Sequence, residues 1–191
     1  ADVSEDQEEM LPDYMLCPDM EMPVKTIEGV DYIGILTIPA LELELPVISE
    51  WNYPNLKIAP CRYGGSAYLN NLIICGHNYR SHFGNLKHLT VGDLAFFTDT
   101  DGNTFTYKMV GQETLSKTSA EAMESGEWDL TLFTCTVGGK NRVTIRFRLE
   151  QNWLACPCRR RRAKKRVAFQ KPQPENTMIF HKKTTALPWA G

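Results

Sequence analysis

One cysteine, one histidine and one arginine stand where strands are expected to begin or end. Cys135 ends an expected strand that starts at Leu130, and His77 follows the apolar run 72–75 and one glycine. Arg142 opens an alternating segment seven residues after the cysteine. A cysteine attacks as a thiolate, which nearby positive charge favours, and histidine exchanges protons near neutral pH. This combination indicates an enzyme that works through an activated thiol.

Two expected strands place the cysteine beside the arginine. Residues 130–135 alternate between two faces and end on Cys135. The glycines at 138–139 permit a turn, and residues 142–149 then alternate between polar and apolar side chains, as in a half-buried strand. Because the loop is short, the first residue of the second strand, Arg142, is expected to lie closest to the thiol.

Two further arginines share the parity of Arg142 on this second strand. A strand rise of ~3.3 Å per residue puts Arg146 about 13 Å and Arg148 about 20 Å further along. We therefore expect neither of them to serve the thiol.

These segments resemble the signature motifs of sortases. Residues 131–135, Thr-Leu-Phe-Thr-Cys, match the family's TLxTC motif, which ends on its nucleophile. Residues 74–78 resemble the motif that carries the catalytic histidine, and residues 142–146 resemble the strand that opens with the essential arginine. The resemblance covers roughly residues 32–149. It implies the catalytic residues His77, Cys135 and Arg142 and a substrate-binding Thr134.

The resemblance also implies a reaction. A sortase is a cysteine transpeptidase that cleaves an LPxTG-like sorting signal near the C-terminus of a surface protein. It holds the acyl group as a thioester and passes it to an amine of a cell-wall precursor or a pilin. No cofactor and no metal are expected. Sortases are usually held at the outer face of the bacterial cytoplasmic membrane by an N-terminal anchor, which we expect to have been removed from this chain.

Three other functional classes are alternatives. Another Cys–His peptidase is one, although papain-like proteases place the cysteine before the histidine and the SHGC-type motif of L,D-transpeptidases is absent. A non-catalytic surface β-domain is the second. A protein that binds its partner through a basic tail is the third.

Several reactive side chains outside the motifs are given other roles. His82 competes with His77, but its place in a polar loop away from the strand end favours a surface role. Cys61 and Cys75 could pair with each other, which the spacing leaves undecided. The Cys-Pro-Cys segment 156–158 has no second ligand pair suitably placed, so it predicts no metal site.

Charge divides the chain into parts. The 191 residues carry a net charge of −2, yet residues 1–150 hold 11 basic and 22 acidic residues, a net charge of −11. Residues 151–191 hold 10 basic residues and one acidic residue, a net charge of +9. The sequence thus predicts an acidic flexible arm at 1–28, a catalytic domain at 29–150 and a basic, disordered tail at 151–191.

Each end segment could instead have a specific function. The arm could be a lid over the site, as in some pilus-building sortases, although residues 11–14 do not match their lid motif. The tail could contact an anionic polymer or lipid, whereas nucleic acid is not the partner that we expect.

The fold class predicted for the domain is a mostly β, closed or nearly closed sortase-like barrel of seven or eight strands with one or two short helices. Strands are expected at 32–38, closed by Pro39, at 41–45, where Leu and Glu alternate up to Pro46, and at 94–98 and 104–110.

The connections between these strands differ in character. Residues 52–70 are rich in loop formers, and some of them should line the groove beside His77. Residues 118–121 match a capping box for a short helix that stops at Gly126. This helical connection is too short for the long helix that class B sortases carry there, which favours the compact class A or class D type.

Overall fold

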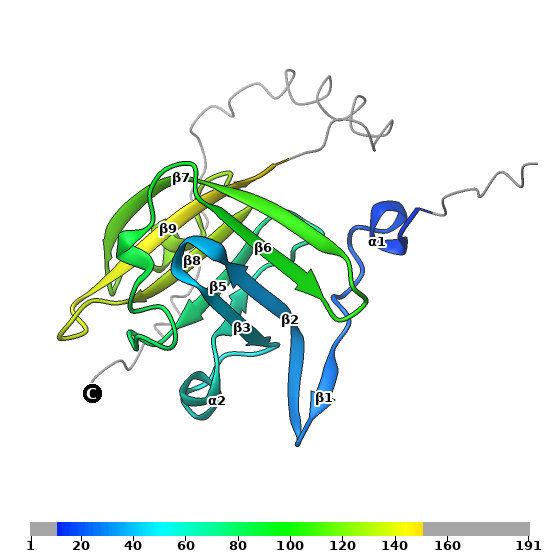
Figure 1. Cartoon of the computed structure of the whole chain (residues 1–191), viewed down its shortest axis with the longest axis horizontal. Coiled ribbons are helices and arrows are strands. Elements are labelled where there is room, and N and C mark those ends of the chain that lie inside the picture. The colour runs from blue at the N-terminus through cyan, green and yellow to red at the C-terminus, as the bar shows by residue number, and fades with distance from the viewer. Residues whose placement is uncertain (1–10, 151–191) are drawn as a thin grey trace, which may run out of the picture. The chain divides into compact units, whose positions relative to one another are not determined.

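Nine strands form one sheet that closes on itself within residues 11–150, the part of the chain that this computed structural model describes. The strands are β1 (Lys25–Ile27), β2 (Val30–Ile38), β3 (Leu43–Ile48), β4 (Cys61–Gly64), β5 (Leu72–Gly76), β6 (Leu94–Asp99), β7 (Thr104–Ser116), β8 (Leu130–Cys135) and β9 (Asn141–Leu149). Their order in the sheet is β1-β2-β3-β4-β5-β8-β9-β7-β6. Strand β6 also pairs with β2, which closes an eight-stranded barrel and leaves β1 as an added strand (Figure 1). The predicted closed β-barrel is confirmed.

Short helices fill some of the connections in this described part. The α-helices are α1 (Asp13–Leu16), α2 (Tyr53–Ile58) and α3 (Ala120–Glu124), with 3-10 turns η1 (Pro39–Leu41) and η2 (Leu86–His88). None of the helices described is long and apolar enough to cross a membrane.

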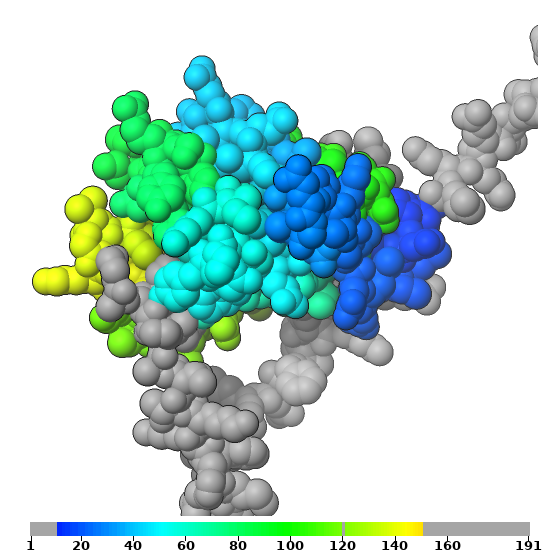
Figure 2. Space-filling view, turned by 90° about the horizontal axis from the view of Figure 1, so that it is seen from below, coloured from blue at the N-terminus to red at the C-terminus, as the bar shows by residue number. Residues whose placement is uncertain are grey.

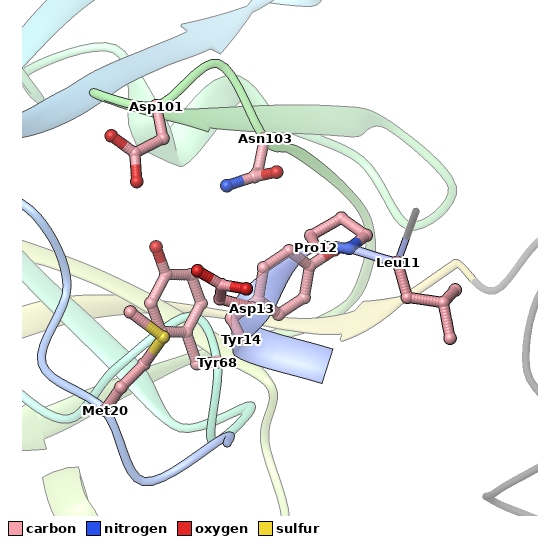
Figure 3. A pocket seen from close by; sticks show the side chains of 8 residues that line it. All are labelled: Leu11, Pro12, Asp13, Tyr14, Met20, Tyr68, Asp101 and Asn103. Atoms are coloured by element: carbon pink, nitrogen blue, oxygen red, sulfur yellow. The ribbon is translucent and has the colours of Figure 1, made fainter. Parts of the chain in front are cut away.

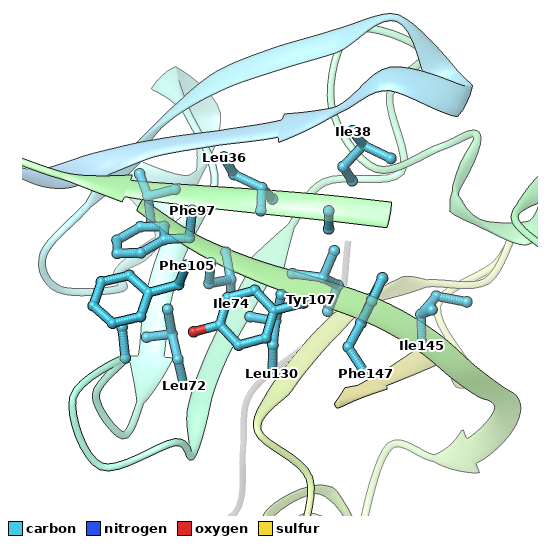
Figure 4. Close-up of a cluster of buried hydrophobic side chains, with 14 of the residues drawn as sticks. Leu36, Ile38, Leu72, Ile74, Phe97, Phe105, Tyr107, Leu130, Ile145 and Phe147 are labelled. Atoms are coloured by element: carbon cyan, nitrogen blue, oxygen red, sulfur yellow. The ribbon is translucent and has the colours of Figure 1, made fainter. Parts of the chain in front are cut away.

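The barrel interior holds the hydrophobic core. Alternation along each strand turns one set of side chains inward, where Phe97, Tyr107 and Phe147 are fully buried. Figure 4 shows these rings packed with aliphatic side chains from β2, β5, β8 and β9. Burial of this apolar surface is the main force that holds the barrel together.

Strand β3 differs from its prediction at both ends. Leu41 belongs to η1 rather than to the strand, and Glu42 follows it in the left-handed region at φ 53°. Strand β3 also runs through Pro46 to Ile48 instead of ending at the proline. Proline is tolerated there because β3 meets β4 only at the pair Ile48–Cys61, so most of that edge requires no donor.

The segment 52–70 contains two elements that the prediction of a loop missed. The side-chain oxygen of Asn52 accepts a hydrogen bond from the backbone N–H of Asn55 at 2.7 Å and caps α2, whose first turn contains a proline. Asparagine at the N-cap with proline in the first helical turn is a helix-start signal. Strand β4 then adds to the edge of β5.

The predicted short helix before β8 is present as α3, but its capping box is not. Ser119 is the N-cap residue and its side chain makes no capping hydrogen bond. Helix α3 and its flanking residues join β7 to β8, so they lie directly before the strand that ends in Cys135.

The described part of the predicted N-terminal arm packs on the barrel. Tyr14 of α1 stacks on Tyr68 with ring centroids 4.8 Å apart and contacts Phe105 at 5.2 Å. Strand β1 pairs with β2, so the sheet begins at Lys25, before the predicted domain boundary. The three-part division stays a prediction, because residues 1–10 and the tail lie outside the described residues.

Helix α1 and the β8–β9 turn lie at opposite ends of the barrel (Figure 1). Phe105, under α1, is ten residues along β7 from Leu115, which pairs with Arg142. At ~3.3 Å per residue this is about 30 Å of strand. Helix α1 therefore forms no lid over Cys135.

A pocket lies where α1 meets the barrel, and Figure 3 shows the side chains around it. Its lining comes from the N-terminal segment, from the segment before β5 and from the β6–β7 turn: Leu11, Pro12, Asp13, Tyr14, Met20, Tyr68, Asp101 and Asn103. This pocket is remote from the predicted nucleophile.

We predict that Tyr14→Ala lowers the free energy of unfolding by about 1–3 kcal/mol, because its ring contacts to Tyr68 and Phe105 are lost. Leu16→Ala, in the same helix but 66% exposed, should change it by less than about 0.5 kcal/mol. Urea unfolding followed by circular dichroism measures both. Equal effects of the two substitutions would contradict the docking of α1.

Candidate active site

Three neighbouring strands bring the predicted catalytic residues into one row. Strands β5 and β8 are parallel and pair Gly76 with Thr134, so His77 and Cys135 follow at the same level. Strands β8 and β9 are antiparallel and pair Cys135 directly with Arg142. Neighbouring strands lie ~4.8 Å apart. We call His77, Cys135 and Arg142 the strand-end row.

The row lies on the outer face of the barrel wall. Leu132, Ile74 and Ile145 point into the core, so the residues of opposite parity on β5, β8 and β9 point outward. Cys135 has this outward parity and is half-buried. Its backbone is held by its own pairing with Arg142 on β9 and by the pairing of the preceding Thr134 with Gly76 on β5.

Thr134 lies on the other face of β8 and is 3% exposed. Its hydroxyl donates a hydrogen bond of 2.8 Å to the carbonyl oxygen of Gly76. This bond ties β5 to β8 immediately below the row, which supports a positioning role. A contact between Thr134 and substrate stays a prediction.

Arg142 is held beside the thiol by the turn that precedes it. Its side chain is 4% exposed, and Nη1 donates to the carbonyl oxygens of Gly139 at 3.2 Å and Asn141 at 3.1 Å. The two glycines at 138–139 both have positive φ, 84° and 68°, which glycine adopts without strain. This turn therefore places a fixed positive charge opposite Cys135.

The loop after His77 folds back tightly on β5. The backbone N–H of Phe83 donates to the carbonyl oxygen of His77 at 3.0 Å. A Cβ atom on Gly76 would lie only 2.6 Å from the Phe83 ring, so glycine is required at this strand end. Phe83 is fully buried and anchors the loop in the core.

His82 is buried, and the prediction of a surface role for it was wrong. It is 8% exposed, because its neighbour Phe83 draws the chain inward. Its Nδ1 atom has no hydrogen-bond partner among the described residues. The ring of Tyr79 contacts both His82, with centroids 5.6 Å apart, and His77, at 4.7 Å.

Burial shifts the pKa values of Cys135 and His77 in opposite directions. Burial raises the pKa of the Cys135 thiol, and the positive charge of Arg142 opposes that rise. Burial lowers the pKa of His77, and the charge of Lys57 on α2 lowers it further. Near neutral pH most molecules therefore hold a neutral thiol and a neutral imidazole, and the thiolate–imidazolium pair is a minor form.

The other cysteines near the row are not competing nucleophiles. Cys61 and Cys75 lie opposite each other on β4 and β5, both buried and both free thiols. Burial raises the pKa of Cys61 to about 12 and that of Cys75 further still. The thiolate required for attack is therefore scarce at both positions.

Aromatic side chains cover the outer face beside Cys135. The ring of Phe133 meets Tyr63 of β4 edge-on at 5.3 Å, and Trp51 stacks on Tyr63 at 5.8 Å. Figure 2 shows α2 and β4 (cyan) beside the segment after β5 (green) and the β8–β9 turn (yellow). The charge of Lys57 on α2 acts on His77, so part of 52–70 lies near this residue, as predicted.

Arg146 fixes α3 to the barrel, a role that the sequence analysis did not assign to it. Its guanidinium donates to the carbonyl oxygens of Ala122 at 2.7 Å and Met123 at 2.9 Å, and to the Thr131 hydroxyl at 2.9 Å. Its Nε forms an ion pair with Glu113 at 2.7 Å. These partners are up to 33 residues away along the chain, so strand parity alone did not reveal them.

The site chemistry that these side chains offer is acid–base and nucleophilic. Within residues 11–150 no group of three or more His, Cys, Asp or Glu is placed to hold a metal ion. A half-buried thiol, a proton carrier and a fixed cation in one row are the parts needed for acyl transfer through a thioester.

Residues 36–150 match the family model described as the sortase domain. The chain belongs to the sortase family. Sortase A of Bacillus anthracis is 26% identical over 125 residues, which span 62% of this chain and 59% of that protein. The match thus spans less than two thirds of that relative's length. The family predicted from the three motifs is confirmed.

Solved structures support the fold of this sortase. Sortase A from Corynebacterium diphtheriae has a TM-score of 0.56 at 21% identity and covers 67% of this chain and 65% of its own. A lid mutant of Streptococcus agalactiae sortase C1 has a TM-score of 0.57 at 20% identity and covers 67% and 71%. Neither likeness assigns this sortase to a class, so the predicted class A or D type stays a prediction.

We predict that Arg146→Ala lowers the free energy of unfolding by about 2–4 kcal/mol, because it leaves buried carbonyl and hydroxyl groups without their donor. Arg148→Ala, which removes only a contact over the Trp128 ring at 5.0 Å, should cost about 1 kcal/mol or less. Urea unfolding compares the two. A smaller loss for Arg146→Ala than for Arg148→Ala would contradict its role as the anchor of α3.

We also predict that the Cys135 thiol ionises at higher pH than a short unstructured cysteine peptide, because burial outweighs Arg142. Arg142→Gln should move the midpoint higher still, since it removes the charge that favours the thiolate. The pH dependence of iodoacetamide alkylation at Cys135, followed by peptide mass spectrometry, measures this midpoint.

Arg148→Gln is the matched control for this titration and should leave the midpoint in place. A midpoint that stays fixed or falls in Arg142→Gln would show that Arg142 does not act electrostatically on the thiol.

Proposed function

We propose that this sortase is a cysteine transpeptidase that cleaves an LPxTG-like sorting signal and transfers the acyl group to a cell-wall or pilin amine. The observation that supports this most is the strand-end row. In this row His77, Cys135 and Arg142 lie at the ends of three adjacent strands, on one outer face of the barrel. Family membership supports the same chemistry.

In the first half of the proposed reaction, the thiolate of Cys135 attacks the carbonyl carbon of the scissile peptide bond. A carbon–sulfur bond forms and the carbonyl oxygen takes the negative charge. The Arg142 guanidinium, fixed on the neighbouring strand, donates hydrogen bonds to that oxygen. The carbon–nitrogen bond then breaks as the imidazolium of His77 protonates the departing amine.

In the second half, an incoming amine attacks the thioester. Neutral His77 takes a proton from the attacking nitrogen, a new amide bond forms, and Cys135 leaves as the thiolate. The imidazolium and thiolate of the starting state are thereby restored. Sulfur is a good leaving group, which keeps the acyl enzyme open to amines.

The proposed reaction uses the minor ionised pair of the site. This pair is most populated between the lowered pKa of His77 and the raised pKa of Cys135. The rate should therefore fall on the acid side as Cys135 loses its thiolate form, and on the alkaline side as His77 loses its proton. A broad maximum across neutral pH follows from the separation of the two values.

The proposed partners follow the family. The substrate is the sorting signal of a surface protein at the outer face of the bacterial cytoplasmic membrane. The acceptor is an amine of the cell-wall precursor or of a pilin subunit. A contact of the basic tail 151–191 with an anionic polymer or lipid is part of this proposal, and that tail lies outside the described residues.

Incubation with an LPxTG-containing peptide and a glycine-based amine tests the proposal, with intact-mass detection of the acyl enzyme and of the ligated product. We predict that Cys135→Ala abolishes both, because the nucleophile is lost. Arg142→Ala and Arg142→Lys should each lower kcat/KM by at least ~100-fold, about 2.7 kcal/mol of transition-state stabilisation. Lysine keeps the charge but not the planar pair of donors.

The matched control is Cys17→Ala, which removes an exposed thiol near α1 and should leave both products unchanged. Cleavage that persists in Cys135→Ala would reject the proposal. Hydrolysis without amine transfer would instead indicate another Cys–His peptidase, and an unreacted peptide with intact folding would indicate a non-catalytic surface domain.

A further inference from the structure

Tyr79 lies against the imidazole of His77 in a near-parallel stack. The ring centroids are 4.7 Å apart and the ring planes differ by 22°. Tyr79 is 50% exposed, so it does not serve to fill the core. A large ring that remains half in water over one face of His77 points to a role in the site.

The backbone of the loop holds this stack in place. The N–H groups of His82 and Gly84 both donate to the carbonyl oxygen of Tyr79, at 3.0 and 2.8 Å. A Cβ atom on Gly84 would lie 2.8 Å from that same oxygen, so the turn requires glycine there. The ring of His82 contacts Tyr79 as well, at 5.6 Å. The position of Tyr79 is therefore fixed by its own loop.

His77 has no carboxylate partner in the part of the chain described. Its Nε2 atom is buried without a hydrogen-bond partner there. The ionisable groups around it are Lys57 from α2, the neighbouring His82, and the Cys135 thiol at the end of β8. Lys57 disfavours a positive charge on the imidazole, and burial keeps His82 neutral.

We propose that Tyr79 is a positioning residue that fixes the ring plane of His77 and stabilises its imidazolium through the electron-rich face of the phenol. An aromatic face attracts a cation stacked on it, and this attraction does not need a carboxylate. The inference rests on the proposed function in one respect, the role of His77 as the acid that protonates the leaving amine.

If the inference holds, the Tyr79 ring affects the pKa of His77, which a residue that only fills space would not do. Loss of the aromatic face should lower the pKa of His77, by about half a unit for an interaction of the size seen at exposed sites. The population of the imidazolium–thiolate pair should then fall about threefold. Tyr79→Phe keeps the face and should keep both properties, because the hydroxyl is not part of the stack.

Nuclear magnetic resonance titration of the His77 ring protons in the full chain tests the inference, with the signal assigned by its loss in His77→Gln. We expect Tyr79→Leu to lower the pKa of His77 by about half a unit and Tyr79→Phe to leave it in place. An unchanged pKa in Tyr79→Leu, or an equal fall in Tyr79→Phe, would overturn the inference. If Tyr79→Leu does not fold, Tyr79→Trp decides, because its larger face should hold the pKa at or above the wild-type value and a lower value would overturn the inference.

A second measurement separates this inference from the proposed function. In the peptide assay, kcat at neutral pH should fall about threefold in Tyr79→Leu and be retained in Tyr79→Phe. A fall in kcat without a change in the pKa of His77 would overturn the inference. A wild-type protein that never cleaves the peptide, combined with the expected pKa changes, would reject the function and leave the stack's effect on His77 established.

Discussion

The parallel pairing of β5 with β8 is the constraint on which the proposed site depends. It sets the end of one strand level with the end of the other, and so places His77 beside Cys135. The Thr134 hydroxyl bonds the Gly76 carbonyl oxygen at the last paired position and fixes this register. A slip of one residue would turn every side chain of the strand to the opposite face, so the site forms only in this register.

The side chains of the strand-end row are partly buried, and this burial sets the pKa values of Cys135 and His77. Burial raises the pKa of the thiol and lowers that of the imidazole, so the reactive ion pair is rare at rest. Arg142 works against this burial for the thiol, and the stack of Tyr79 is inferred to work against it for His77. In the proposed mechanism the thiol becomes reactive when its proton moves to His77.

The sequence was sufficient for the strands that carry the site, because alternation and paired glycines act locally. Residues 130–135 and 142–149 correspond to β8 and β9 almost without change. It was insufficient wherever burial depends on segments far apart. His82 was predicted at the surface but is buried next to Phe83, whose ring lies in the core. Arg146 was expected only to lie away from the thiol, and its hydrogen bonds to α3 were not predicted. Neither contact leaves a periodic signal.

A crystal structure of the protein with a sorting-signal mimic bonded through a disulfide to Cys135 would test the central claim most directly. The account predicts that the carbonyl group standing for the scissile bond lies between the Arg142 guanidinium and the His77 imidazole. The Arg142 guanidinium should lie about 3 Å from the carbonyl oxygen, and the His77 imidazole about 3 Å from the leaving-group position. A peptide that is bonded to Cys135 but directed away from both residues would contradict the account, since His77 and Arg142 would then take no part in the reaction.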